Sequence, residues 1–136
     1  MDTGTEQTAA AEVAEHHRFI EAWLRGTADP GRLAEFVEMH TPDFTLCGPD
    51  GGAVGRDAIA SGFGAGHGTA PGISVEIRGA RLVAAEGDLV VAAYEEHQEA
   101  PPSIRRSTVV FTRDPGARNG LRWKHLHETW IMPPAG

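Results

Sequence analysis

In the carboxyl-terminal half of the chain, the character of the side chains repeats every second residue. From Ile73 onward the side chains alternate in character over long segments, which is typical of strands. Short turn sequences rich in glycine and proline separate the segments. Four strands are predicted, at 73–84, 89–99, 103–113 and 121–131. Consecutive strands joined by short turns form an antiparallel meander, so we expect one long antiparallel sheet.

The amino-terminal half carries the helical period instead. Apolar residues and histidines recur at three- and four-residue spacing, which predicts a first helix from about residue 8 to Arg25 that ends at Gly26. Asp29 and Pro30 resemble a cap followed by proline at the first helical position, so a short second helix follows. Three further elements are expected before the long strands: a short strand at 44–47, a turn at 48–52 and a helix at 55–61. Helices first and sheet last indicate an α+β fold.

The chain of 136 residues has the length of one domain. We expect residues 1–7, which are small and polar, to be a disordered tail and residues 8–136 to form a single domain. No apolar run approaches the roughly 18 residues of a membrane helix, and the first residues lack the basic and apolar regions of a signal peptide. We therefore expect a cytoplasmic protein without a membrane partner. The net charge of −7 argues against nucleic acid as a partner.

The last predicted strand has several aromatic and histidine side chains that could line a binding site. It reads L-R-W-K-H-L-H-E-T-W-I, and strict alternation places Trp123, His125 and His127 on one face. We expect this face to point inward as the wall of a pocket. Leu126 and Trp130 then lie on the outer face.

The second long strand, 89–99, is apolar on both faces in its middle, from Leu89 to Tyr94. One face packs against the helices. The chain has no sequence left for another layer, so the other face predicts a homodimer through the outer surface of the sheet, together with Leu126 and Trp130.

Three stretches resemble the nuclear transport factor 2-like superfamily, also called cystatin-like, and its SnoaL-like branch. They are D-F-T-L-C-G-P-D-G-G-A-V-G-R-D-A-I at 43–59, D-L-V-V-A-A-Y at 88–94 and W-K-H-L-H-E at 123–128. The branch includes the association domain of calcium/calmodulin-dependent protein kinase II. The resemblance implies a cone of helices packed on a long curved antiparallel sheet. It implies no single activity, because this cone serves isomerases, dehydratases, epoxide hydrolases, polyketide cyclases and assembly domains.

The resemblance also suggests where a buried ion pair lies. The kinase association domain has a pocket arginine where this chain has Glu96, and an acidic position on its next strand is matched by Arg106. Alternation puts Glu96 on the face of Tyr94 and Arg106 on the face of Thr108. If these faces point inward with His127, the candidate catalytic groups His127, Glu96 and Arg106 converge in an apolar cavity, where burial moves a pKa toward working pH. The alternative is a satisfied polar cluster that fixes the pocket without chemistry.

These observations leave two functions open. The pocket is expected to bind a small, mostly apolar ligand that carries a carboxylate or a carbonyl. The ligand-binding side chains predicted around it are Tyr94, Trp23, Thr108, Trp123, His125 and Phe63. The chain is then either an acid–base enzyme of isomerase, cyclase or dehydratase type, or a domain for ligand binding or assembly without turnover.

No cofactor is expected. His125 and His127 stand two residues apart and supply two metal ligands, but a metal needs a third. Glu96 and His97 cannot share an inward face with each other, and we expect Cys47 to be a small buried apolar side chain without a partner for a thiolate site. The glycine-rich loop after the third helix does not join a strand to a helix, so it lacks the geometry of a nucleotide-binding loop. We therefore predict no metal, nucleotide or flavin.

Overall fold

A sheet of six strands in the order β2-β1-β6-β5-β4-β3 forms one side of the molecule. The computed structural model describes residues 3–135. The strands are β1 (His40–Cys47), β2 (Ala53–Gly55), β3 (Ser74–Glu86), β4 (Leu89–Glu99), β5 (Ser103–Arg113) and β6 (Leu121–Met132). Strands β1 and β6 are parallel, whereas the other neighbours are antiparallel. This confirms the predicted α+β meander.

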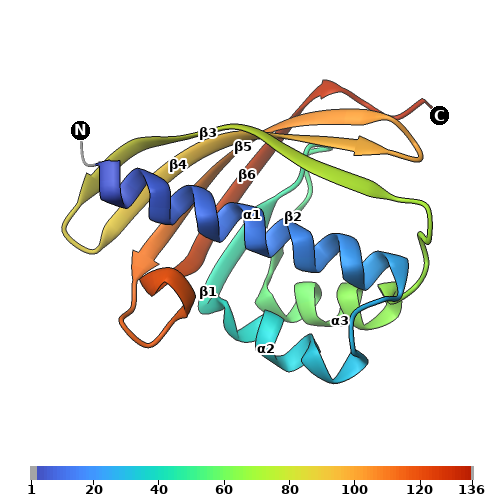
Figure 1. The fold of residues 1–136 in the computed structure, drawn as a ribbon, viewed down its shortest axis with the longest axis horizontal. Helices are drawn as coiled ribbons and strands as arrows, with labels where there is room; N and C mark the ends of the chain where they lie inside the picture. The colour runs from blue at the N-terminus through green and yellow to red at the C-terminus, as the bar shows by residue number, and fades with distance from the viewer. Residues whose placement is uncertain (1–2, 136) are drawn as a thin grey trace.

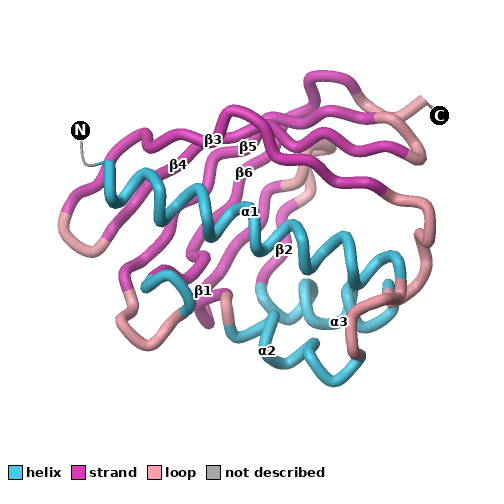
Figure 2. Tube along the Cα trace, in the orientation of Figure 1, coloured by secondary structure: helices cyan, strands magenta, loops and turns pink. Residues whose placement is uncertain are grey.

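Three α-helices cover one face of this sheet (Figure 1). They are α1 (Thr3–Arg25), α2 (Leu33–Glu38) and α3 (Arg56–Gly66), with short 3-10 turns at Pro30–Arg32 and Arg118–Gly120. Helix α1 runs along the sheet, while α2 and α3 lie together at one end of it (Figure 2). Helix α3 continues through glycines that the sequence placed in a loop. None of the helices in residues 3–135 combines the length and apolar character that crossing a membrane requires.

Helix α1 begins earlier than the sequence predicted. The expected disordered tail is wrong over residues 3–7, and the expected domain boundary at residue 8 moves with it; Met1, Asp2 and Gly136 lie outside the described residues. The first turns are anchored to the sheet, because Ala9 is buried and the Glu6 carboxylate accepts the Leu82 amide at 2.9 Å.

Strand β6 contains a one-residue bulge. Phe111 of β5 pairs with Trp123, but the next pair is Val110 with His125, so Lys124 is an extra residue on β6. A bulge of this kind exchanges the inward and outward faces of the strand beyond it. The sequence gives no direct sign of it, because the alternation continues without interruption through residue 124.

The bulge overturns part of the predicted pocket wall. Leu126 and Glu128 are buried on the inner face, while His127 is exposed on the outer face with His125. The predictions that His125 and His127 point inward and that Leu126 and Trp130 point outward are therefore wrong. Trp130 instead packs on the inner-face Arg105, whose guanidinium carbon lies 4.7 Å from the indole centroid.

Strand β5 also faces the opposite way from the prediction. Its register places Arg105 opposite Glu96 and Arg106 opposite Glu95. Arg105 therefore points inward, whereas Arg106 and Thr108 are exposed on the outer face. The predicted Glu96–Arg106 pair does not form, and Arg106 instead lies 3.8 Å from Glu95. Both faces of β5 carry small and apolar residues, so alternation alone did not determine which one is buried.

Candidate active site

A partly enclosed cavity of about 190 Å³ lies between the helices and the inner face of the sheet. Its walls are mainly apolar and come from the helices and β1: Ile20, Phe36, Phe44, Leu46, Ile59 and Phe63. Its polar groups come from α1, β1 and the central strands: His16, His17, His40, Glu96, Gln98, Arg105 and Glu128. Drug-sized pockets occupy roughly 300–1,000 Å³, so this one suits a small metabolite.

A buried ion pair joins α1 to β4 in this cavity. His17 Nε2 lies 3.1 Å from Glu96 Oε1, and His17 Nδ1 lies 2.8 Å from the Val13 carbonyl oxygen. Gln98 Nε2 donates to the second carboxylate oxygen of Glu96. A carbonyl can only accept, so His17 donates from Nδ1.

The surroundings of Glu96 determine its charge. Burial by itself raises the pKa of Glu96, but the hydrogen bond and charge of His17, with Arg105 and Gln98, outweigh burial and lower that pKa to about 2. Glu96 is therefore a carboxylate at neutral pH. The two ring nitrogens of His17 thus contact two acceptors, the Val13 carbonyl and the Glu96 carboxylate.

Arg105 connects β5 to β6 beside this pair. Its Nη1 donates to Glu128 Oε1 at 3.3 Å, and Ser107 Oγ donates to the other oxygen of Glu128 at 3.4 Å. Arg105 Nε is buried and has no hydrogen-bond partner among the described residues. A buried guanidinium N–H without a partner is available to an oxygen of a bound molecule.

Glu128 differs from Glu96 in its acidity. Burial raises the pKa of Glu128 above its usual value, the charge of Arg105 opposes this, and the negative charge of Glu96 raises the pKa further. The cavity thus holds two carboxyl groups whose environments move their pKa values in opposite directions. Such a pair can divide the roles of ionised group and proton-transfer group.

Two neutral histidines form the other side of the cavity. His40 Nδ1 donates to the Phe36 carbonyl at 3.0 Å, so His16 Nε2 donates to His40 Nε2 at 3.1 Å. Burial lowers the pKa of His40 to about 4. Burial is the largest cause that lowers the pKa of His16 well below its usual value, and the charge of Arg118 lowers it further. His16 Nδ1 has no partner in residues 3–135, so it presents a free lone pair.

A third buried carboxyl group, that of Glu12, holds α1 in place. Glu12 is 1% exposed and accepts hydrogen bonds from Trp123 Nε1 at 2.9 Å, from Arg118 Nη2 at 2.8 Å and from Asn119 Nδ2 at 3.1 Å. The next turn of α1 carries His16, whose ring stacks on Trp123 with centroids 3.8 Å apart. Glu12 therefore fixes the helix that presents His16 to the cavity.

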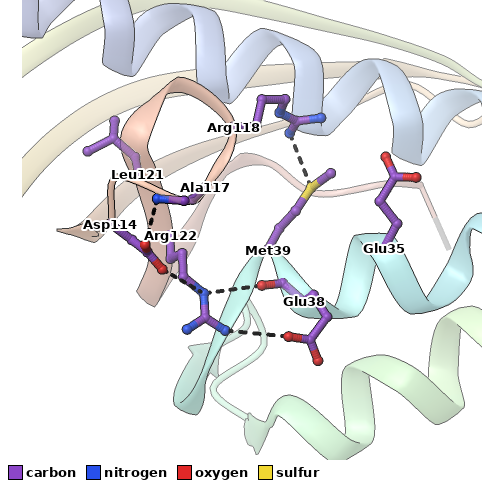
Figure 3. A pocket seen from close by; sticks show the side chains of 9 residues that line it. Glu35, Glu38, Met39, Asp114, Ala117, Arg118, Leu121 and Arg122 are labelled. Atoms are coloured by element: carbon purple, nitrogen blue, oxygen red, sulfur yellow. Dashed lines mark hydrogen bonds and ion pairs between the residues drawn. The ribbon is translucent and has the colours of Figure 1, made fainter.

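A larger, open groove of about 360 Å³ lies outside the cavity, between α2 and the turn before β6 (Figure 3). Its charged side chains pair with one another. Arg122 lies 3.9 Å from Asp114 and 4.0 Å from Glu38, and Arg118 donates to the Met39 sulfur at 3.2 Å. The groove lies at the surface and its charged side chains already have partners, whereas the cavity under the helices holds buried polar atoms, and we place the candidate site there.

The structure separates the predicted site residues into three groups. Glu96 and Phe63 line the cavity. Trp23, Tyr94 and Trp123 are buried beside it, and the Tyr94 hydroxyl has no hydrogen-bond partner of normal geometry in the described chain, although Ser107 is close enough to affect its pKa. Burial raises that pKa well above its usual value. The third group lies outside the cavity on the outer face: His125, His127, Arg106 and Thr108.

Several cavity residues were missed by the sequence argument. His16 and His17 already lay on the buried face predicted for the first helix, so their position was visible although their role was not. Arg105 and Glu128 replace Arg106 and His127. Each is the next residue along its strand, and only the register of β5 and the bulge of β6 identify it.

Helices that cover one face of a curved, mostly antiparallel sheet, with a cavity between the two layers, define the nuclear transport factor 2-like class of α+β domains. The profile of the SnoaL-like domain family matches residues 16–119, and the chain belongs to this family. No curated protein matches the chain at a significant level.

Solved structures confirm the fold. A nuclear transport factor 2-like protein of unknown function from Pseudomonas aeruginosa is 34% identical, with a TM-score of 0.84 over 91% of this chain and 98% of its own. A candidate calcium/calmodulin-dependent protein kinase type II association domain from Thiobacillus denitrificans is 19% identical, with a TM-score of 0.62 over 89% and 94%. A candidate dehydratase from Streptomyces avermitilis is 16% identical, with a TM-score of 0.66 over 93% and 99%. The last two likenesses concern the fold alone.

Proposed function

We propose that the cavity binds a small molecule with a carbonyl or carboxylate group and catalyses a proton transfer on it without a cofactor. The reaction is then of isomerase, cyclase or dehydratase type. The observation that carries this proposal is a partly enclosed cavity in which Glu96 and Glu128 lie beside Arg105, whose buried Nε has no hydrogen-bond partner within residues 3–135. The candidate dehydratase with this fold is consistent with such chemistry.

Each polar group has a distinct role in this proposal. Arg105 Nε donates a hydrogen bond to the ligand oxygen and stabilises negative charge that develops there. Glu128 takes a proton from the carbon next to the carbonyl and returns it to a neighbouring atom, because burial raises its pKa and makes the ionised carboxylate a stronger base than an exposed one. Glu96, whose pKa is lowered by the hydrogen bond from His17, stays ionised and supplies a fixed negative charge.

Deuterium exchange tests the proposal directly. The protein is incubated in D₂O with a panel of small keto acids and enones, and deuterium at the carbon next to the carbonyl is measured by NMR. We expect exchange with the wild type and its loss in Glu128→Gln, while binding remains. Glu95→Gln, on the outer face of the neighbouring strand, is the matched control and keeps the activity.

Arginine variants test the binding role separately. Arg105→Met removes the buried donor and should weaken binding of carbonyl ligands by roughly 10-fold or more, since a hydrogen bond to a charged group contributes about 1.5–3 kcal/mol. Arg106→Met, exposed on the opposite face, should bind as the wild type does. Equal exchange by wild type and Glu128→Gln would refute the catalytic role.

A non-catalytic ligand-binding domain is the second candidate. It is favoured by the way in which the polar groups already pair with one another, Glu96 with His17 and Gln98, and Glu128 with Arg105. A ligand that binds in the cavity, needs Arg105, and shows no proton exchange or conversion would support this candidate over the enzyme.

We also propose that the chain forms a homodimer through the outer face of the sheet. The inward positions of Leu126 and Trp130 remove them from this argument, which now depends on the outer side of β3 and β4. Val83 is 43% exposed and Leu89 is 44% exposed there. Sedimentation equilibrium should show a dimer that Leu89→Glu dissociates. A wild type that is monomeric at high micromolar concentration refutes the proposal.

A further inference from the structure

Three side chains with metal-binding atoms converge on the outer face of the sheet. They are Cys47 of β1 and His125 and His127 of β6. One ligand atom from each lies within 4.8 Å of the others. Cys47 and His125 are half-buried and His127 is exposed, so the group is open to solvent.

The backbone brings these residues together. Strands β1 and β6 are parallel neighbours, and their register places Thr45 beside His125 and Cys47 beside His127. The alternate residue pair of the same register, Leu46 beside Leu126, points inward and lines the cavity. The cysteine and both histidines therefore share the opposite face.

Two predictions change as a result. Cys47 was expected to be a small buried apolar side chain, and this is wrong, because its thiol is half-buried beside two imidazoles. The sequence argument rejected a metal because it found no third ligand for His125 and His127. The parallel pairing of β1 with β6 supplies that ligand from residues nearly eighty positions away in the chain.

Thr45 holds one of the rings. Its Oγ1 lies 2.6 Å from His125 Nδ1. When Nδ1 donates this hydrogen bond, the lone pair of the imidazole is on the other ring nitrogen, which is free to coordinate. Metal-binding histidines commonly have such a partner, which orients the ring and fixes its tautomer.

We propose that Cys47, His125 and His127 bind one transition-metal ion of the Zn²⁺ type, through a thiolate and two imidazoles, with a fourth position open to water. One sulfur and two nitrogen donors exclude Mg²⁺ and Ca²⁺, which prefer oxygen ligands. Zn–N bonds of about 2.0–2.1 Å and a Zn–S bond of about 2.3 Å in a tetrahedron put the ligand atoms about 3.4–3.6 Å apart. The ligand atoms, which lie within 4.8 Å of one another, reach this spacing by changes in side-chain rotation alone.

This site is independent of the proposed catalytic cavity, which lies on the other face of the same strands. Metal binding to the full chain is measured with reduced, chelator-treated protein. Zn²⁺ is titrated in competition with a chromogenic chelator, and Co²⁺ is added to a second sample as a spectroscopic probe. We expect one ion per chain and a near-ultraviolet charge-transfer band from cobalt bound to the thiolate.

Variants identify the ligands. Cys47→Ser should abolish the charge-transfer band, and His125→Ala and His127→Ala should each weaken Zn²⁺ binding by about 100-fold or more. Thr45→Val, which removes only the orienting partner, should weaken it by about 10–100-fold. His97→Ala is the matched control, because His97 is bonded to Glu95 outside the group, and it should bind as the wild type does.

Circular dichroism on each variant establishes that the fold is kept. The proposal is overturned if the wild type takes up less than one tenth of an ion per chain, if Co²⁺ binds without a thiolate band, or if Cys47→Ser and His127→Ala bind Zn²⁺ as tightly as the wild type.

Discussion

Replacing Glu96 by glutamine should change both the stability of the protein and its dependence on pH. The pKa of Glu96 falls from 4.5 to about 2 on folding, a difference worth about 3 kcal/mol at 1.36 kcal/mol per unit. Its side chain is only 6% exposed, so solvent screening does not reduce this figure much. Repulsion between Glu96 and Glu128 is relieved at the same time, which makes about 3 kcal/mol an upper value.

The sign follows from the lowered pKa. A carboxyl group whose pKa is depressed by folding stabilises the protein above its unfolded pKa, and this contribution is lost as the pH falls through the folded pKa. Wild type should therefore lose the Glu96 contribution between pH 4.5 and pH 2. Glu96→Gln should be less stable at neutral pH by up to about 3 kcal/mol, and the difference between the two proteins should shrink to near zero at pH 2.

Denaturant titrations at several pH values measure this difference. Carboxyl groups that do not interact with Glu96 titrate alike in both proteins, so their contributions cancel, whereas Glu128 loses the part of its pKa rise that Glu96 causes. Glu95→Gln is the control, because Glu95 is 39% exposed on the outer face and its loss should stay within about 0.5 kcal/mol. If the difference in free energy of unfolding between Glu96→Gln and the wild type is the same at neutral pH and at pH 2, the contact of Glu96 with His17 does not stabilise the fold.

Three further outcomes are expected. Glu128→Gln should be more stable than the wild type at neutral pH, because a carboxyl with a raised pKa stabilises the fold only while protonated; denaturant titration should show this advantage disappearing below pH 4.5. Glu12→Ala should lose about 3 kcal/mol in the same assay, because it leaves Trp123 Nε1 buried without an acceptor, whereas the half-buried Glu15→Ala should lose little. Deleting Lys124 should leave a protein that folds by circular dichroism, because the pairs Phe111–Trp123 and Val110–His125 then become consecutive and Leu126 still points inward.

The order of elements was predictable because it depends on local periodicity. Strands β4 and β5 have the predicted bounds, and the first helix buries the face that its spacing indicated. Glu96 was placed on the inner face with Tyr94 because β4 alternates without a bulge at that point. Where each side chain's direction follows from its own segment, the sequence was sufficient.

The rest of the site depends on the pairing of strands. Glu128 replaced His127 because one bulged residue reversed β6, and Arg105 replaced Arg106 because the register with β4 determines the facing of β5. A single strand cannot encode either fact, since each is a property of two strands in contact. The same limit hid the partner of His125 and His127, because Cys47 reaches them only through the parallel pairing of β1 with β6.

The two proposed sites share β1 and β6 and use their opposite faces. Leu46 and Leu126 point into the cavity, while Cys47 and His127 point to the outer face of the same paired positions. Side-chain changes on one face leave the backbone of the other unchanged, so Cys47→Ser should keep deuterium exchange and Glu128→Gln should keep Zn²⁺ binding. A side-chain variant that fails in both assays has moved the strands themselves, because the two sites have only this backbone in common.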